Sequence, residues 1–420
     1  MRTENKLSEL AVNGGPKVRT EPWPGPGHLG AEEKAAIDAL FDEAIAAGSV
    51  IGYNGPAEEA YCKDFVALFG GKGYADGVNS GTSAVYVALR ALELEPFTEV
   101  ISSPITDPGG MMPIVLVNCI PAVADAVPGG FNTGPEQIEQ LISPLTSAIL
   151  VAHIAGEPVD MEGIMAVARK HGIPVVEDCA QAHGAKLNGK LVGLFGDIAA
   201  FSTMFGKHYC TGGQGGLVYT RNEKLYIAAR QIADRGKPFG LPEGSTNCVA
   251  SLNLNLDEIG AAIGRVQLKK MPEIVQRRRE VVAGIAEGIG QFETVSMPPI
   301  LPGAEPSYWF VRLRFHPQKA ACDKETYCKA LIAEGMPINP RYDAMPHTLD
   351  WYQKRKVFGT GGLPWTSSLY KGDPNRQFHC PNAQAAIDSH FNLGAHQGWG
   401  DREVADTIAA FKKVEAAYAK

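Results

Sequence analysis

Three short segments of the sequence combine residue types that could hold and react with a charged organic group. The first is residues 79–83 (NSGTS), in which Gly81 precedes the hydroxyl side chains of Thr82 and Ser83 at the expected start of a helix. Free N–H groups and the positive end of the helix dipole favour an anion such as a phosphate there. Serine and threonine are also ordinary N-caps, so this segment alone leaves an anion site and simple capping both open.

The second segment is residues 175–184 (VVEDCAQAHG), in which two apolar residues lead into the adjacent acids Glu177 and Asp178. Acids at the end of an apolar strand are either solvated or buried as partners of a cationic group. Taken alone, the segment fits both interpretations, and its neighbours favour the second.

The third segment is residues 201–207 (FSTMFGK), followed by the glycine-rich residues 211–216 (TGGQGG). Burial among apolar neighbours would lower the pKa of Lys207 and make its amine a usable nucleophile. A surface lysine whose charged end reaches solvent is the alternative. The glycines permit tight turns or the close approach of a ligand.

In combination, the three segments supply the parts that a pyridoxal phosphate site requires. The phosphate needs an anion cradle, the pyridinium nitrogen needs a carboxylate, and the aldehyde needs a lysine amine. The acids follow the cradle by about 100 residues, and Lys207 follows Asp178 by 29 residues. We therefore expect pyridoxal 5'-phosphate as the cofactor.

Other classes of partner lack the residues that they need. No GxGxxG follows the first expected strand and no GxxxxGK[ST] occurs, which disfavours dinucleotides and nucleoside triphosphates. The net charge of −7 disfavours nucleic acid. The eight cysteines are scattered without zinc spacing, and the apolar stretches are shorter than a membrane span. We expect reduced thiols, no metal, no membrane contact and a cytoplasmic location.

Alternating helices and short apolar strands would position these segments. Helical spacing is expected over residues 32–47, 57–69, 82–92, 136–142, 161–171, 257–270, 274–289, 324–334 and 401–418. Buried strands are expected over residues 99–102, 120–123, 148–152, 174–176, 198–201 and 216–219, and strand-like stretches over 308–315 and 335–338. This order predicts an α/β fold with a mostly parallel sheet, whose ligands lie outside the carboxyl ends of the strands.

The chain is long enough for two to three domains. We expect a large cofactor-binding domain over residues 1–270 and a smaller α+β domain over residues 271–420. The N-terminal segment is expected to pack on the smaller domain.

Several segments in the same order resemble the DegT/StrS family of sugar and cyclitol aminotransferases. The resemblance covers nearly the whole chain. The matching segments are residues 10–16 (LAVNGGP), 79–84 (NSGTSA), 151–160 (VAHIAGEPVD), 177–185 (EDCAQAHGA) and 202–207 (STMFGK), then Asn253 with 257–268, and Tyr342 with His347. The family implies the fold type I of pyridoxal phosphate enzymes, with a seven-stranded, mainly parallel sheet that has helices on both faces.

The resemblance also implies roles for individual residues. Lys207 would bind the cofactor and then move protons, Asp178 would pair with the pyridinium nitrogen, and Gln181 would lie beside the ring. The phosphate would be held by Gly81, Thr82, Ser83 and Ser202, together with Asn253 of a neighbouring subunit. A homodimer with shared sites follows from that last contact. In dehydrating relatives a histidine replaces the lysine, so Lys207 implies transamination.

Four departures separate the chain from the centre of the family. Asp107 stands where an aromatic residue commonly packs on the cofactor ring, and residues 211–216 carry an extra glycine and a glutamine in place of glutamate. Asn255 replaces an expected arginine, and the stretch from Tyr342 to His347 is one residue longer than usual. These departures bear mostly on the substrate.

The expected reaction moves an amino group from glutamate or glutamine to a keto-sugar or cyclitol ketone in two half-reactions. Candidate substrate contacts are Asp107, His183, Tyr342 and His347. Arg312 is expected to point outward from an edge strand, and the basic run at residues 277–279 is expected to form a solvated helix face.

Three alternatives remain at this stage. The chain could be a sensing protein that keeps the cofactor without turnover, which the altered residues around Asp107 motivate. It could instead be a pyridoxal phosphate enzyme that performs another reaction on a sugar. A dinucleotide-dependent oxidoreductase is the third alternative, and it lacks its glycine fingerprint.

Overall fold

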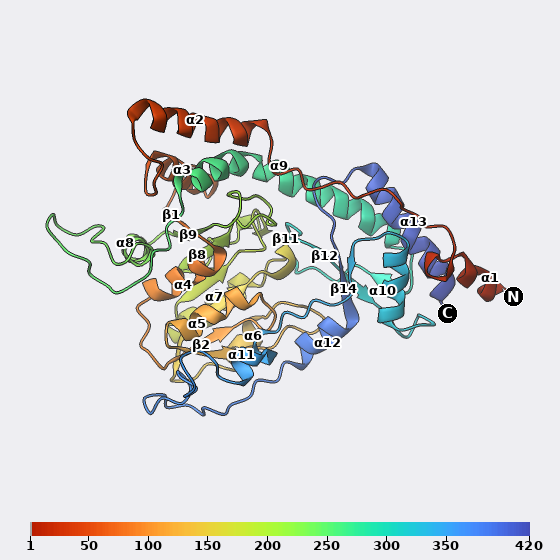
Figure 1. Cartoon of the computed structure of the whole chain (residues 1–420). Coiled ribbons are helices and arrows are strands. Elements are labelled where there is room, and N and C mark those ends of the chain that lie inside the picture. The colour runs from red at the N-terminus through yellow and green to blue at the C-terminus, as the bar shows by residue number, and fades with distance from the viewer. Residues whose placement is uncertain (1) are drawn as a thin grey trace.

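The computed structural model describes residues 2–420 and contains a seven-stranded sheet in the order β1-β9-β8-β5-β4-β2-β3 (Figure 1). In that order, the strands are β1 (Tyr74–Val78), β9 (Gly216–Thr220), β8 (Ile198–Ser202), β5 (Val175–Asp178), β4 (Thr146–Ala152), β2 (Glu99–Ser102) and β3 (Ile120–Val123). The strands from β8 to β3 pair in parallel, whereas β9 is antiparallel to both of its neighbours. The predicted seven-stranded, mainly parallel α/β sheet is therefore confirmed.

The sheet carries helices on both faces. They are α3 (Pro56–Leu68), α4 (Gly81–Ala91), α5 (Met112–Leu116), α6 (Pro135–Glu139), α7 (Met161–His171), α8 (Glu223–Ala233) and the first part of α9 (Glu258–Ile289). Helix α2 (Ala31–Ala47) packs on the outer side of α9 (Figure 1). Side chains of a strand alternate between the two faces, so Val176 packs in the core beneath α4 while Val175 packs in the core beneath α7. Because both faces are covered, the strands consist of nearly continuous apolar runs.

The edge strand β1 was not predicted from the sequence. Its residues YADGV include a charged residue and a glycine, both of which are uncommon in strands. Asp76 is nevertheless buried, because the guanidinium of Arg230 lies 3.1 Å from its carboxylate. The ion pair with Arg230 offsets part of the cost of burying the Asp76 charge. The hydropathy pattern shows the charged residue but not its partner, so it does not indicate a strand here.

Helix α9 runs without interruption for 32 residues and contains Pro272. We predicted two helices here, and that prediction was wrong. A proline inside a helix removes one hydrogen bond and clashes with the preceding turn. Packing outweighs this cost: Leu268 lies in the core with α3, whereas Val281 and Ile285 lie in the core of the second sheet. The predicted domain boundary near residue 270 falls within this helix and stays a prediction.

The second sheet has the order β10-β12-β14-β13 and is antiparallel. Its strands are β10 (Val295–Ser296), β12 (Val311–Phe315), β14 (His390–Leu393) and β13 (Ile338–Asn339), and it packs with α10 (Lys324–Ala333), α13 (Asp401–Tyr418) and the end of α9. Leu10 is fully buried in the same core, which places the N-terminal segment beside the C-terminus (Figure 1).

The remaining elements are short. They are α1 (Arg2–Glu9), α11 (Asp350–Gln353), α12 (Pro381–Ser389), and a three-stranded sheet of β11 (Ala304–Glu305), β6 (Lys186–Leu187) and β7 (Lys190–Leu191). Within residues 2–420, no helix is long and apolar enough to cross a membrane.

Arg312 connects the two sheets, and the expectation that it points outward was wrong. It lies on the inner strand β12 and is 3% exposed. Its Nε donates to the Glu157 carboxylate at 2.9 Å, and its Nη2 donates to the second carboxylate oxygen. Glu157 follows β4 of the large sheet, so a bidentate ion pair replaces the solvation that an edge position would supply.

Loss of this arginine should strongly destabilise the protein. Arg312→Met leaves Glu157 buried without its partner, which typically costs about 3–5 kcal/mol. We expect urea unfolding to show a loss of that size, and the double variant Arg312→Met, Glu157→Leu to recover most of it. Lys354→Met, which breaks an exposed pair with Asp350, is the matched control and should change stability little. Equal stability of the single variant and the control would contradict this interpretation of the pair.

Candidate active site

The three predicted segments meet at one edge of the large sheet. Strands β1, β5 and β8 all end at this edge, and Gly216 of β9 pairs with both Val78 and Ser202. Gly81 therefore lies directly beside Ser202: a Cβ atom on Gly81 would come within 2.5 Å of the Ser202 Cβ. Only glycine fits at this first position of α4.

The start of α4 is both capped and available to an anion. Ser80 is the N-cap, and its hydroxyl accepts a hydrogen bond from the Ser83 N–H at 3.1 Å. The Ser83 hydroxyl in turn donates to the Asn79 amide oxygen at 2.7 Å. Capping satisfies only part of the first turn, because an α-helix leaves its first four N–H groups without intrahelical acceptors. The two interpretations of the segment are therefore compatible.

The two adjacent acids of the second segment have different surroundings because successive strand residues face opposite sides of the sheet. The Glu177 carboxylate accepts hydrogen bonds from the N–H groups of Gly193, Phe195 and Gly196 at 2.6–2.8 Å. Its other contact is His153 Nε2 at 3.2 Å, and these two residues with Cys179 form a buried cluster. Glu177 is thus occupied by the protein itself.

Asp178 faces the site. Its carboxylate is buried and accepts a hydrogen bond from the Ala180 N–H at 3.0 Å, and burial raises its pKa. Within residues 2–420, no basic side chain forms an ion pair with it. The backbone of Gly110 passes close by: a Cβ atom there would come within 2.8 Å of Asp178 Oδ2. Only glycine therefore fits at position 110, beside the second carboxylate oxygen.

Lys207 follows β8 in a turn, in which its N–H donates to the Met204 carbonyl. The side chain is only 7% exposed, and burial lowers its pKa to about 8, although the Asp178 and Asp107 carboxylates act in the opposite direction. The alternative left open by the sequence, a surface lysine whose charged end reaches solvent, does not fit this burial. The lysine Nζ lies over the indole ring of Trp309, 3.8 Å from the ring centre.

Gln181 and Tyr342 form another wall of the site. The Gln181 amide oxygen accepts from the Ala155 N–H at 2.9 Å, and its amide nitrogen donates to the Tyr342 hydroxyl at 3.0 Å. Burial raises the pKa of Tyr342 to about 12, so the hydroxyl stays protonated at neutral pH. Both ends of the Gln181 amide are therefore fixed in orientation.

Asp107 lies exposed at the mouth of this cluster. Its carboxylate accepts a hydrogen bond from the Gly109 N–H at 2.9 Å and caps a short 3₁₀ turn. The neighbouring Thr106 N–H donates to the Ala344 carbonyl, which ties this loop to the one that carries Tyr342. The aromatic residue that the family commonly has at position 107 is absent, and the aromatic ring against Lys207 is Trp309.

The two candidate histidines are both buried. His183 lies behind the site, where its Nε2 is 2.8 Å from the Ser202 carbonyl oxygen, and burial lowers its pKa to about 4. Burial also lowers the pKa of His347 to about 4, and the charged group acting on it is Asp125. A structural role fits His183 better than substrate contact, and His347 is not brought to Lys207 by a contact in the described chain.

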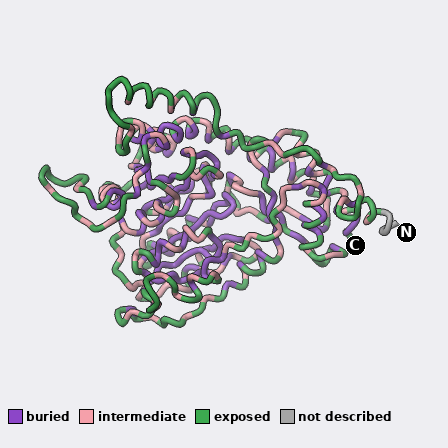
Figure 2. Tube along the Cα trace, viewed as in Figure 1, coloured by how far each residue is buried: buried purple, intermediate pink, exposed green. Residues whose placement is uncertain are grey.

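Asn253 lies on an exposed segment beyond α8, part of which extends away from the body of the molecule (Figures 1 and 2). Its amide oxygen accepts a hydrogen bond from the Asn255 amide at 2.7 Å. The side chain is therefore held at the surface, and its predicted contact with a phosphate stays a prediction.

Sequence reasoning missed Trp309 and misjudged Arg278. Arg278 is 3% exposed, and its Nη1 donates to the carbonyl oxygens of Tyr308 and Trp309 at 2.8 and 3.1 Å. The prediction of a solvated helix face was wrong for this residue, because α9 packs against the 307–309 segment. No pattern in the sequence marks this pairing, since the two segments are joined only by the fold.

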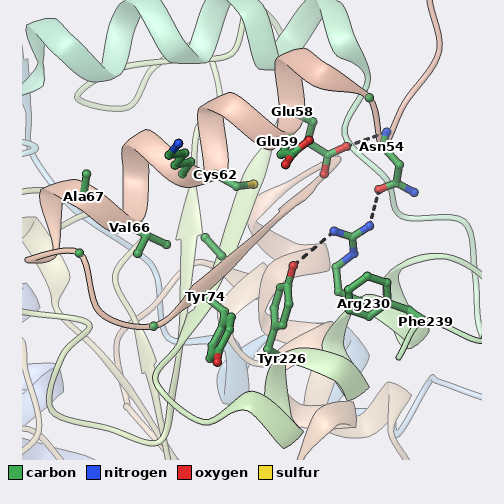
Figure 3. Close-up of a pocket in the computed structure, with 15 residues that line it drawn as sticks. Asn54, Glu58, Glu59, Cys62, Val66, Ala67, Tyr74, Tyr226, Arg230 and Phe239 are labelled. Carbon is green, nitrogen blue, oxygen red and sulfur yellow. Dashed lines mark hydrogen bonds between the residues drawn. The ribbon is translucent and has the colours of Figure 1, made fainter. Parts of the chain in front are cut away.

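A separate cavity of about 670 Å³ lies between α3, β1 and α8 (Figure 3). Arg230 donates there to the Tyr226 hydroxyl and the Asn54 amide oxygen, and Glu58 accepts from the Asn54 N–H. Burial raises the pKa of Glu58 to about 7. None of the predicted site residues lines this cavity.

Comparison with known proteins places the chain in a family. Residues 31–373 match the model of the DegT/DnrJ/EryC1/StrS aminotransferase family. The chain is 35% identical over 357 residues to a UDP-N-acetyl-3-dehydro-alpha-D-glucosamine 3-aminotransferase of Acidithiobacillus ferrooxidans, with 85% of this chain and 86% of that protein covered. It is 30% identical over 425 residues to an L-glutamine:2-deoxy-scyllo-inosose aminotransferase of Streptomyces fradiae, with 97% and 98% covered.

Among solved structures, a candidate sugar aminotransferase of Streptococcus pneumoniae, Spr1654 in its PLP form, has the same fold. Its TM-score is 0.78 at 21% identity, with 94% of this chain and 98% of that one covered. The protein therefore belongs to the DegT/DnrJ/EryC1/StrS aminotransferase family, as the sequence motifs predicted. It is an aminotransferase on the fold of pyridoxal phosphate enzymes.

The buried lysine predicts a pH-dependent stability of the cofactor-free protein. The folded pKa of about 8 lies below the ordinary lysine pKa of 10.5, so between these pH values the unfolded chain binds a proton that the folded chain does not. Stability should therefore rise with pH across this window. At pH 7 the charged lysine costs on the order of 3 kcal/mol.

Lys207→Met removes this cost. We expect the variant to be more stable than the cofactor-free wild type at pH 7, with the difference shrinking towards pH 10.5, as measured by urea unfolding. Lys412→Met, at an exposed position, is the control and should show no such trend. A difference between Lys207→Met and wild type that is constant with pH would contradict the lowered pKa.

Proposed function

We propose that this chain is a pyridoxal phosphate-dependent aminotransferase in which Lys207 binds the cofactor. The donor is glutamine or glutamate, and the acceptor is a keto-sugar or a cyclitol ketone. One observation carries the proposal: Lys207 and Asp178, two buried and oppositely charged side chains, act on each other at the same strand edge without forming a direct ion pair. They lie beside the glycine-started helix α4.

The residues present fit the cofactor. A buried charge that lacks a partner is costly. A cationic ring nitrogen would give Asp178 such a partner, and an aldehyde would react with the amine of Lys207. Glycines at positions 81 and 110 let the backbone pack directly against Ser202 and Asp178, where any side chain would clash, and so bring the start of α4 and the acid into the same site. The start of α4 supplies the N–H groups and dipole that a phosphate requires.

In this proposal each residue has one task. Asp178 would pair with the ring nitrogen, and Gln181, fixed by Ala155 and Tyr342, would lie beside the ring. Lys207 would bind the cofactor and act as the proton carrier. Gly81, Thr82, Ser83 and Ser202 would hold the phosphate. When bound, the cofactor supplies an electron sink that allows an amino group to leave one carbon and later join another.

The relatives support the choice of substrates. One is named for a glutamine donor and a cyclitol ketone, and the other for a dehydro-sugar linked to UDP. The two acceptors share a ketone on a polyhydroxylated ring, which we propose as the substrate class here. The exposed Asp107 at the mouth of the site offers a hydrogen-bond acceptor for ring hydroxyl groups.

We also propose a homodimer with shared sites. Apolar side chains are exposed on α2 and on the segments near the site, including Ile45 at 74%, Phe205 at 64% and Leu252 at 59%. Leu252 adjoins Asn253, the residue proposed to reach the phosphate of a second copy. A partner subunit that covers these residues would remove them from water. The free state of all eight cysteines is in keeping with the proposed cytoplasmic location.

A sensing protein without turnover is the second candidate. The observation that favours it is the open position at Asp107, where no aromatic side chain packs on the ring. A sensor would bind the cofactor without converting it to the amine form, whereas an aminotransferase would convert it.

The cofactor lysine can be tested by absorbance. Purified protein with added pyridoxal phosphate should show the band of a lysine-bound cofactor, which borohydride removes and Lys207→Ala lacks. Glutamine or glutamate should convert the band to that of the amine form, and a ketone acceptor should restore it. Lys190→Ala, at a lysine outside the site, is the matched control. A protein that takes up no cofactor would overturn the proposal, and uptake without conversion by any amino acid would favour the sensor.

Shared sites can be tested with a mixed dimer. Asn253→Asp places a carboxylate beside the proposed phosphate and should weaken cofactor binding about tenfold or more, equivalent to at least about 1.4 kcal/mol. A dimer of one Lys207→Ala chain and one Asn253→Asp chain, isolated with two affinity tags, then contains one intact site and one doubly damaged site.

We expect this mixed dimer to bind about one cofactor per two chains with wild-type affinity and to show about half of the wild-type activity. If each chain instead builds its own site, both sites in the mixed dimer carry one defect. Activity near zero, with weak cofactor binding only, would therefore contradict the sharing of Asn253.

A further inference from the structure

The indole of Trp309 is the aromatic surface against which the Lys207 side chain rests. The lysine Nζ lies 3.8 Å from the ring centre, well within the distance at which a cation is attracted to the face of an aromatic ring. Tryptophan is the strongest partner for such a contact, and the low exposure of Lys207 limits screening by water. Family membership assigns no task to this residue.

Trp309 is held rigidly from several directions. Its indole N–H donates to the Gly206 carbonyl at 2.8 Å, so the ring is tied to the residue that precedes Lys207. Its backbone N–H donates to the Ala155 carbonyl at 3.0 Å, and its own carbonyl accepts from the buried Arg278 at 3.1 Å. These hydrogen bonds fix the ring independently of the Lys207 side chain.

The backbone before Trp309 is equally constrained. The Ser307 N–H donates to the Gly156 carbonyl at 2.9 Å, and the Ser307 carbonyl lies 3.1 Å from His208 Nε2. Tyr308 has a φ of 49°, a left-handed conformation that is unfavourable for a side chain with Cβ. Contacts to the large sheet on both sides of Tyr308 maintain this conformation and direct the next residue towards Lys207.

The charged and titratable groups around the Lys207 amine are few. The carboxylates of Asp178 and Asp107 attract the ammonium. His183 and His208 lie on the other side, and burial lowers the pKa of both, so they are neutral at pH 7. His28 adjoins the Lys207 backbone, and burial lowers its pKa also. Besides Asp178, the described groups that can stabilise the Lys207 ammonium are therefore the Asp107 carboxylate and the Trp309 ring.

We propose that Trp309 is a positioning residue that holds the ε-ammonium of Lys207 whenever the lysine is not bound to the cofactor. This inference rests on the proposed role of Lys207 as the cofactor lysine. This contact holds the ammonium against the face of the Trp309 ring and so keeps it from pairing directly with the Asp178 carboxylate. Trp309 belongs to the segment leading into β12, so the small sheet contributes to the placement of a large-sheet lysine.

The pKa of Lys207 in the cofactor-free protein tests the proposal. Competitive labelling with acetic anhydride at a series of pH values, followed by peptide mass spectrometry, gives this pKa directly, with the exposed Lys412 of the same sample as reference. Trp309→Leu removes the π surface, so the ammonium loses its attraction and the pKa should fall by about 0.4 to 1.5 units. Trp309→Phe keeps a weaker π surface and should show a smaller fall.

Each outcome decides the matter. A pKa of Lys207 that falls from wild type to Trp309→Phe and further to Trp309→Leu supports the proposed role of Trp309. An unchanged or raised pKa of Lys207 in a Leu variant with native circular dichroism overturns it, because water then solvates the ammonium as well as the indole did. If the Leu variant does not fold, an unchanged pKa in the Phe variant overturns it. The measurement needs no bound cofactor, so it is separate from the absorbance test: wild-type protein that fails to take up pyridoxal phosphate would refute the proposed function and leave the labelling result standing.

Discussion

Two opposite charges, on Lys207 and Asp178, are buried at one strand edge without pairing directly, and the rest of the site depends on this arrangement. Burial shifts both groups towards their neutral forms, as the lowered pKa of the lysine and the raised pKa of the acid show. Main-chain contacts hold both residues in place. The Ala180 N–H donates to the Asp178 carboxylate, and the Lys207 N–H donates to the Met204 carbonyl. Both groups are therefore poised to engage a ligand between them.

The topology explains how distant segments meet. Because β9 runs antiparallel between β1 and β8, its first residue Gly216 lies beside the ends of both. That single reversal brings the helix start at Gly81 against Ser202, although the two are far apart in the sequence. The parallel strand β5 adds Asp178 at the same edge. The order and direction of the strands thus bring the site residues together at the ends of the strands.

Much of the fold was predictable because apolar runs and helical spacing are local properties, and six of the seven strands of the large sheet were found this way. What failed depended on contacts between distant segments. Strand β1 was missed because it contains the charged Asp76, whose partner Arg230 lies far along the chain. Arg278 and Arg312 were expected to face solvent because their hydrogen-bond acceptors also lie elsewhere in the chain. For the site, the family resemblance implied Lys207 and Asp178, and their roles stay predictions. The structure adds that both are buried, whereas Glu177 is hydrogen-bonded to main-chain N–H groups on the other side of the strand. Trp309 carries no local signal at all.

Helix α9 gives the molecule a lever. Pro272 cannot donate a backbone hydrogen bond to the preceding turn, so the helix is most easily bent there. From Pro272 to Ile289 the helix extends for about 25 Å, so a change of about 10° at the proline would displace its far end by roughly 4 Å. Arg278 lies on this part of the helix and donates to the Trp309 carbonyl. The same half of α9 packs in the core of the small sheet, so this one hydrogen bond links the small sheet to the segment beside Lys207.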